Sequence, residues 1–173
     1  ELSNHDHSRF LTRTNHRVGR ISYAGAEAAS SGINPAIMRE AVAVQMTWPG
    51  APTVYYGDEA GVCGFTDPDN RRTYPWGRED KTLVRFHRDM IRIHRENPAL
   101  RTGSVKFLRG EKDILCFARF NRTQQFVVVV NNDAYTRSIE VGVCGAGIPS
   151  SCKLTQIMYS TEENYSMAPV TYQ

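Results

Sequence analysis

Two segments of the chain have the apolar pattern of α-helices. Residues 36–46 are apolar on nearly every side, and Asn34-Pro35 before them provides an N-cap and a proline suited to the first helical position. Residues 81–96 place apolar side chains at spacings of three and four, opposite arginines at 85, 88, 92 and 95. We therefore expect a buried helix over 36–46 and a surface helix over 81–96, whose arginine face is solvated.

The rest of the first hundred residues reads as a short strand and two long polar loops. Residues 53–56 are β-branched or aromatic, which is typical of a buried strand, and the loops cover 5–33 and 57–79. Strands that alternate with helices indicate a parallel sheet or barrel. Both loops follow strand ends, which is the face where (β/α)₈ barrels build their active sites.

After residue 102 the pattern changes to short β-rich runs separated by turn residues. The runs cover residues 105–108, 114–120, 126–131, 138–143 and 154–159, at the spacing of an antiparallel β-sandwich. Because residues 126–130 are apolar without interruption, we expect this run to lie between two sheets. Residues 170–173 read as the beginning of another strand, so we expect the sandwich to lack its end.

Composition narrows the possible partners. The chain is 40% hydrophobic with a formal net charge of +3, and its basic residues are interleaved with acidic ones, so a folded protein without a nucleic-acid partner is expected. No apolar run approaches the ~20 residues of a membrane span. Four cysteines without a C-x-x-C pair favour a cytoplasmic over a secreted location and make a zinc site unlikely to form. Cys116 is expected to be a buried thiol, whereas Cys144 and Cys152 either bridge a loop or stay free.

Three polar stretches hold residues suited to sugar chemistry. Glycosidic bond cleavage needs paired carboxylates around an oxocarbenium-like transition state, and a further anion stabilises its charge. Asp6 is suited to this last role, and His5 beside it can donate a hydrogen bond to a sugar hydroxyl. The alternative reading of Asn4-His5-Asp6 is a turn capped by its own Asn or Asp side chain.

The other two stretches offer aromatic faces and charged groups. In residues 50–59, Tyr56 can stack on a sugar or donate a hydrogen bond to it. Glu59 either contacts substrate or has a structural role, pairing with an arginine or capping backbone amides. In residues 67–76, Asp67 and Arg71 can bind hydroxyl pairs, or they form an ion pair that keeps the loop rigid; both can hold at once.

Taken together, these stretches resemble a known family. Asn4-His5-Asp6, residues 50–59, residues 67–76 and Asn97-Pro98-Ala99-Leu100, in this order and spacing, are similar to the alpha-amylase family of glycoside hydrolases, in particular its neopullulanase and amylopullulanase branch. The resemblance implies an α/β plus all-β fold class. Residues 1–101 would be the last β/α units of a (β/α)₈ TIM barrel, and residues 102–173 an antiparallel β-sandwich C-terminal domain.

The resemblance also implies an activity and residue roles. It implies a retaining hydrolase acting on the α-glucosidic bonds of starch, pullulan or maltodextrins, with Asp6 as the transition-state stabiliser. Asn4 and His5 would contact the same sugar, and Asp67 and Arg71 would bind the glucan chain. Tyr56 belongs to a motif that is mainly architectural in the family, and we expect its ring to contact substrate.

Two catalytic groups of the family have no counterpart in the sequence. The nucleophilic aspartate and general-acid glutamate lie on earlier barrel strands, so we expect this chain alone to be inactive and to need the N-terminal part of the barrel as its partner. No cofactor is expected; calcium, used by many relatives, has no supporting acidic loop here. The alternative function is a non-catalytic module that binds glucan or stabilises a partner, for which Asp6→Asn would change little.

Overall fold

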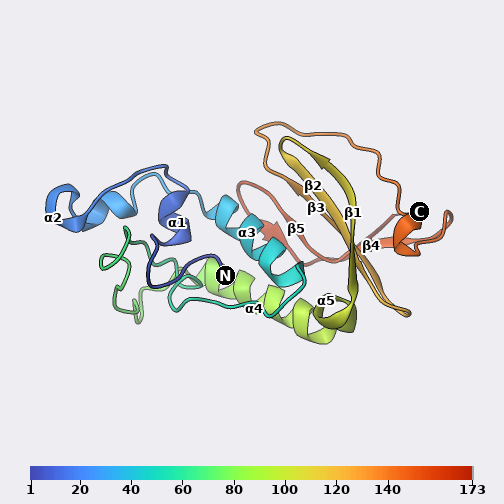
Figure 1. The fold of residues 1–173 in the computed structure, drawn as a ribbon, viewed down its shortest axis with the longest axis horizontal. Coiled ribbons are helices and arrows are strands. Elements are labelled where there is room, and N and C mark those ends of the chain that lie inside the picture. The colour runs from blue at the N-terminus through green and yellow to red at the C-terminus, as the bar shows by residue number, and fades with distance from the viewer. Residues whose placement is uncertain (173) are drawn as a thin grey trace. The chain divides into compact units, whose positions relative to one another are not determined.

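The computed structural model describes residues 1–172, with the element order shown in Figure 1. The chain forms two compact units. The first comprises Glu1–Gln45, Pro52–Met90 and Ser160–Asn164, and the second comprises Met46–Ala51, Ile91–Tyr159 and the residues from Tyr165 on. This division reflects only which residues pack together. The predicted boundary after residue 101, between the barrel units and the β-sandwich domain, stays a prediction.

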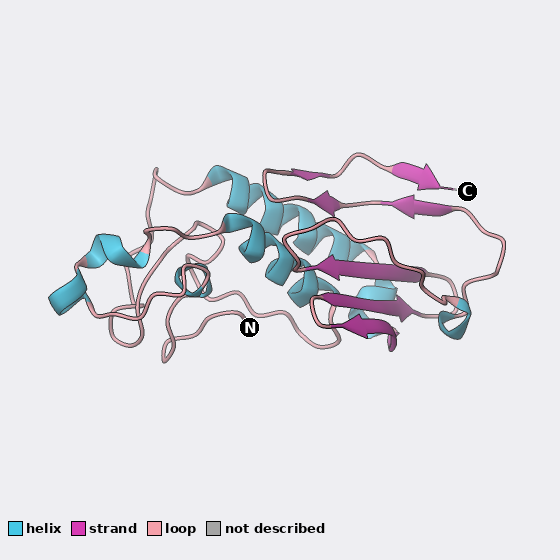
Figure 2. Ribbon diagram, turned by 90° about the horizontal axis from the view of Figure 1, so that it is seen from above, coloured by secondary structure: helices cyan, strands magenta, loops and turns pink. Residues whose placement is uncertain are grey.

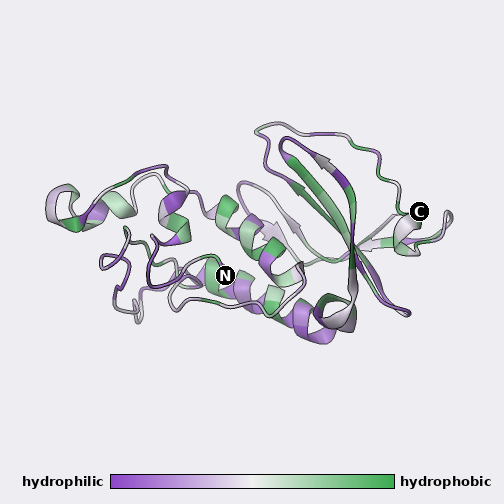
Figure 3. Ribbon diagram, viewed as in Figure 1, coloured by the Kyte–Doolittle hydropathy of each residue, from purple (hydrophilic) through white to green (hydrophobic). Residues whose placement is uncertain are grey.

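The two longest helices confirm the periodicity of the sequence. Helix α3 (Pro35–Thr47) begins after Asn34, whose Oδ1 accepts the backbone N–H of Ala36 at 2.9 Å, so the predicted N-cap is present. Helix α4 (Lys81–Glu96) exposes its arginines and shows hydrophilic and hydrophobic positions in turn in Figure 3. The buried side chains of the two helices within the first unit include Met38, Val42, Leu83, Phe86 and Met90.

Two expectations for the first unit are wrong. The loop over 5–33 contains short helices, α1 (Phe10–Arg13) and α2 (Ile21–Ala24), and a 3₁₀ turn, η1 (Ala26–Ala29). Residues 53–56 form no strand among the described residues and are largely exposed. A β-strand is stable only when neighbouring strands satisfy its backbone groups, and within residues 1–172 no strand pairs with this segment.

The second unit is built on a three-stranded antiparallel sheet that follows the short helix α5 (Pro98–Thr102). Strands β1 (Ser104–Glu111), β2 (Ile114–Phe120) and β3 (Gln125–Asn131) lie in the order β1-β2-β3. Figure 2 draws the strands of the protein as arrows, with helices and loops in other colours. The central strand β2 is the buried one. The expectation that 126–130 lies between two sheets is wrong, because β3 is an edge strand whose side chains are half-buried or exposed.

A turn of the chain and two smaller sheets complete this unit. The 3₁₀ turn η2 (Cys144–Ala146) contributes Ala146, which packs with Ile148 against Ala118 of β2 in a small apolar cluster. Strand β4 (Leu154–Gln156) pairs with β7 (Val170–Tyr172), and β5 (Tyr159–Ser160) pairs with β6 (Tyr165–Ser166). In the described part of the chain residues 138–143 form no strand, contrary to expectation.

Some further expectations can be compared with the structure. The strand predicted over 170–173 is present as β7 up to Tyr172, and Gln173 lies outside the described residues. Cys116 is buried as expected, and Cys144 and Cys152 are both free and exposed. Over residues 1–172 no helix is both long and apolar enough to cross a membrane.

Candidate functional site

The carboxylate of Asp6 lies exposed on a turn whose main chain is held by Asn4. Asn4 Oδ1 accepts hydrogen bonds from the backbone N–H of Asp6 at 2.9 Å and of His7 at 3.1 Å. Nε2 of His5 lies 3.3 Å from Oδ1 of Asp6, and the two side chains are 63% and 66% exposed. The capped turn weighed from the sequence is therefore present, and it directs a carboxylate and an imidazole toward solvent.

A second stretch of the candidate site, residues 66–72, packs directly on this turn. Thr66 Oγ1 donates to the carbonyl oxygen of Asp6 at 3.0 Å, and Asn70 Nδ2 donates to the carbonyls of His5 at 3.0 Å and His7 at 2.7 Å. These contacts join positions 60 to 65 residues apart in the sequence. The structure thus brings together two of the stretches that the sequence singled out.

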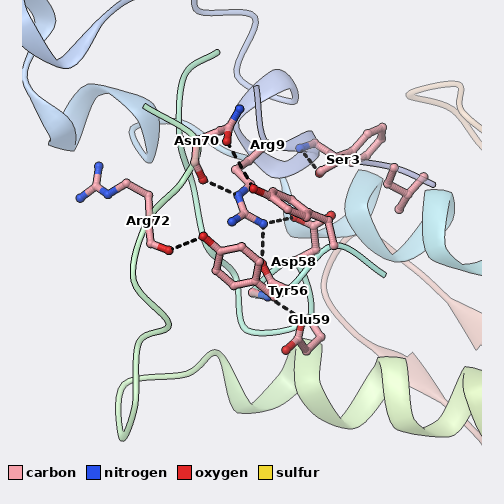
Figure 4. A network of polar contacts seen from close by, with 12 residues as sticks. Ser3, Arg9, Tyr56, Asp58, Glu59, Asn70 and Arg72 are labelled. Atoms are coloured by element: carbon pink, nitrogen blue, oxygen red, sulfur yellow. Dashed lines mark hydrogen bonds and ion pairs between the residues drawn. The ribbon is translucent and has the colours of Figure 1, made fainter. Parts of the chain in front are cut away.

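The buried side chain of Arg9 links these stretches to a third. Its Nε donates to the carbonyl of Asn70 at 2.9 Å, and its Nη1 donates to the carbonyl of Tyr56 at 2.5 Å. Its guanidinium also lies 4.0 Å from the ring centre of Tyr55, within the range of a cation–π interaction. Figure 4 shows Arg9 at the centre of this polar network.

The charge of Arg9 is compensated by Asp58. Nη1 of Arg9 lies 3.1 Å from Oδ1 of Asp58, and both side chains are buried. Burial raises the pKa of the Asp58 carboxyl, and hydrogen bonds from Ser3 and Arg9 oppose that rise. A buried pair of this kind fixes geometry, because removing either partner leaves a charge without solvent or counter-ion.

Tyr56 and the Asp67–Arg71 pair lie at the edges of the network. The hydroxyl of Tyr56 donates to the carbonyl of Arg72 at 2.7 Å, and its ring stays partly exposed. Nε of Arg71 donates to Oδ1 of Asp67 at 2.6 Å across an exposed pair, and this bond raises the pKa of the Arg71 guanidinium. The ion-paired reading of the loop is therefore present, and a role of these groups in substrate binding stays a prediction.

The carboxylate of Glu59 serves the backbone in this structure. Its Oε2 accepts the N–H of Gly57 at 2.9 Å, closing a local turn after the exposed segment 53–56. Of the two readings open from the sequence, the geometry favours backbone capping for Glu59.

Because Gly64 has no side chain, its own backbone packs directly against the backbone of residues 69–70. We expect Gly64→Ala to lower the free energy of unfolding by roughly 1–3 kcal/mol. An added Cβ would lie 2.7 Å from the carbonyl oxygen of Asp69 and 2.8 Å from Cα of Asn70, and backbone atoms cannot turn aside as a flexible side chain can. Urea unfolding of the 173-residue chain measures the change.

The control for this substitution is Gly142→Ala, where an added Cβ would meet no atom within 4 Å. Its effect should stay within about 0.5 kcal/mol. Equal stability of Gly64→Ala and the unsubstituted chain would contradict the packing described here.

The donor groups of the described residues do not form a metal site. Within residues 1–172 no group of three or more His, Cys, Asp or Glu side chains is arranged to hold a metal ion.

The role of two residues that organise the site was not predicted from the sequence. Arg9 and Asn70 have no exposed surface, although arginine and asparagine are mostly exposed in proteins. Neither hydrophobic period nor turn chemistry marks a polar residue whose partners lie far along the chain. One signal was present: Asn70 belongs to a polar stretch that already resembled a family motif.

Comparison with known proteins gives relatives of one kind. No family model matches the sequence. The amylopullulanase of Thermoanaerobacter thermohydrosulfuricus is 39% identical over 118 residues, which is 68% of this chain and 8% of that protein. Neopullulanase 2 of Thermoactinomyces vulgaris is 33% identical over 150 residues, covering 84% of this chain and 23% of that protein. The chain thus spans less than a quarter of the length of these relatives.

Solved structures show the same kinship. The alpha-amylase of Anoxybacillus, described as a glycosyl hydrolase, superposes on 90% of this chain and 28% of its own with a TM-score of 0.65 and 28% identity. These similarities confirm the predicted fold class, the last β/α units of a (β/α)₈ barrel followed by an antiparallel β-sandwich.

Proposed function

Because the chain belongs to the alpha-amylase family of glycoside hydrolases, we propose that it is part of a retaining α-glucan hydrolase in which Asp6 stabilises the transition state. One observation supports this role above the others. The carboxylate of Asp6 is exposed beside His5, while the main chain that carries it is held on both sides. A carboxylate that stabilises the positive charge of the transition state is most effective when its position is fixed before the substrate binds.

The other residues of the site would bind the sugar chain. Asn4 and His5 contact the sugar that Asp6 acts on, and Tyr56, Asp67 and Arg71 bind the glucan chain. The substrates are α-glucans such as starch, pullulan or maltodextrins, since the relatives are named amylopullulanase and neopullulanase. Residues 1–101 belong to the catalytic barrel and residues 102–173 to the β-sandwich domain.

The nucleophile and the general acid would come from residues outside this chain. Retaining cleavage needs a carboxylate that attacks the sugar and a carboxylic acid that protonates the leaving oxygen. The chain spans only 8% and 23% of the two relatives above, which leaves most of an enzyme of their length to supply these groups. The complete site would therefore form when this chain joins the N-terminal part of the barrel. No cofactor takes part in the proposed reaction.

Glucan binding without catalysis is the second candidate function. The indole of Trp76 is 80% exposed, and its ring centre lies 4.4 Å from that of Tyr74. The exposed ring of Trp76 beside the half-buried ring of Tyr74 offers a flat apolar face of the kind that sugar rings stack on. This candidate predicts that the chain binds glucan and that Asp6→Asn does not change this binding.

The test is reducing-sugar release from soluble starch and pullulan by the 173-residue chain, beside its Asp6→Asn variant. We expect no release from either, because two of the three catalytic carboxylates are absent. Release that disappears in the variant would contradict the placement of nucleophile and acid outside this chain. Retardation of the chain in a starch-containing gel, unchanged by Asp6→Asn, would favour the binding module.

A further inference from the structure

Three consecutive backbone carbonyls around Asp6 are held by two side chains of the 66–70 loop. The carbonyl of Asp6 accepts from Thr66 Oγ1 at 3.0 Å. The carbonyls on either side of it, those of His5 and His7, both accept from the single amide nitrogen of Asn70. An amide NH₂ group has two N–H donors, so both are used.

Asn70 is itself held in place from the other side. Its side chain is fully buried, and its backbone carbonyl accepts a hydrogen bond from Nε of Arg9 at 2.9 Å. Arg9 is in turn fixed by its ion pair with Asp58 and by the carbonyl of Tyr56. The backbone of Asn70 is therefore anchored to a buried charge pair, and its buried side chain extends from this fixed point to the turn.

The side chain of Asp6 has no comparable support of its own. Its carboxylate contacts His5, and both side chains are more than 60% exposed. The main chain beneath it therefore fixes the point from which the carboxylate extends. That main chain is held through its amides by Asn4, and through its carbonyls by Thr66 and Asn70.

The geometry assigns Asn70 and Thr66 as positioning residues for Asp6. These two residues act through Asp6 and neither touch the substrate nor take part in the chemistry. This inference rests on the proposed function, because it presumes that Asp6 acts on the substrate. The loop that holds Asp6 also carries Asp67 and Arg71, so the same loop would fix the transition-state carboxylate and the groups proposed to bind the glucan. Displacing a catalytic group by about 1 Å can cost on the order of 100-fold in rate.

The test uses the full-length enzyme that contains these residues. Asn70→Asp keeps the size of the side chain but replaces the single nitrogen that donates both hydrogen bonds with an oxygen atom facing two carbonyls. Thr66→Val removes the hydroxyl at an exposed position and keeps the shape. We expect kcat on pullulan or maltodextrin to fall by roughly 10–100-fold for Asn70→Asp and less for Thr66→Val. KM should change little, and Thr66→Ser should restore kcat because it restores the donor.

Two controls separate positioning from general damage. Thr102→Val removes a hydroxyl that also donates to a backbone carbonyl, that of Pro98 at 3.3 Å, and should leave kcat unchanged. In an Asp6→Asn background, Asn70→Asp should cause no further loss of kcat, since a residue that acts only through Asp6 has nothing left to position. A purely structural role would lower activity in both backgrounds.

The outcomes also distinguish this inference from the proposed function. If Asp6→Asn retains full activity, the proposed function fails and the inference fails with it. If Asp6→Asn is inactive while folded Asn70→Asp and Thr66→Val enzymes keep the original kcat, only the inference is overturned. If Asn70→Asp does not fold, the inference is tested by comparing Thr66→Val with Thr66→Ser. An unchanged kcat in Thr66→Val then overturns it.

Discussion

Replacing Asp6 with Asn in the full-length enzyme should lower kcat on starch or pullulan by roughly three to five powers of ten. The substitution keeps the shape of the side chain and removes the negative charge that would stabilise the oxocarbenium-like transition state. Because the ground-state substrate carries no such charge, its binding should be largely kept and KM should change by much less than kcat. Steady-state kinetics of the two enzymes measure both quantities.

A matched control for this prediction is Glu140→Gln, which makes the same carboxylate-to-amide change at an exposed position of the second unit. We expect its kcat to equal that of the unsubstituted enzyme. A kcat for Asp6→Asn within about threefold of that value would exclude Asp6 from the catalytic group, since losses of transition-state charge stabilisation are far larger.

Replacing Arg9 with Met should destabilise the 173-residue chain by about 3–5 kcal/mol. The guanidinium has no exposed surface and compensates the buried charge of Asp58 at 3.1 Å. Without it, that carboxylate stays buried without a counter-ion, and the carbonyls of Tyr56 and Asn70 each lose a donor. The loss should appear as a lower midpoint in urea unfolding monitored by circular dichroism, with little change in slope.

The pH dependence of this variant follows from the buried carboxylate. Burial raises the pKa of Asp58 in the folded protein, and without Arg9 the main opposing charge is gone. A group whose folded pKa lies above its unfolded pKa favours folding at low pH, and this contribution is lost as the pH rises through the folded pKa. The destabilisation by Arg9→Met should therefore be smaller at acidic pH than at neutral pH.

Two further variants make this prediction specific. The double substitution Arg9→Met with Asp58→Leu removes both charges and should recover much of the lost stability, because a buried pair is often replaceable by apolar groups. Arg88→Met, at an exposed position of α4, should change stability by less than about 0.5 kcal/mol. Equal effects of Arg9→Met and Arg88→Met would mean that the buried pair contributes nothing measurable.

Local patterns in the sequence were sufficient to predict the two long helices and the three strands of the main sheet. Helices α3 and α4 follow from apolar spacing and from the Asn34 cap, which depend on residues at most four positions apart. Strands β1, β2 and β3 follow from short β-rich runs between turns. Family membership also came from the sequence, since short motifs in a fixed order are specific when taken together.

The tertiary structure decided which segments find partners. Residues 53–56 have the composition of a buried strand but no neighbouring strand among the described residues, and composition does not encode the presence of a neighbour. The run 126–130 is apolar enough for the interior of a sandwich. Its side chains are nevertheless half-buried or exposed, because their burial depends on what packs on the two faces of the sheet and not on the run itself.

The sequence alone determined which residues could perform sugar chemistry, and the tertiary structure determined how they are held. Asp6, His5, Asp67 and Arg71 could be chosen from residue type and motif. The support beneath them comes from Arg9 and Asn70, whose contacts join positions 47 to 65 residues apart. A polar residue becomes a buried support only when distant backbone carbonyls and a counter-ion converge on it. No local period records that convergence, because it arises when the loops pack together.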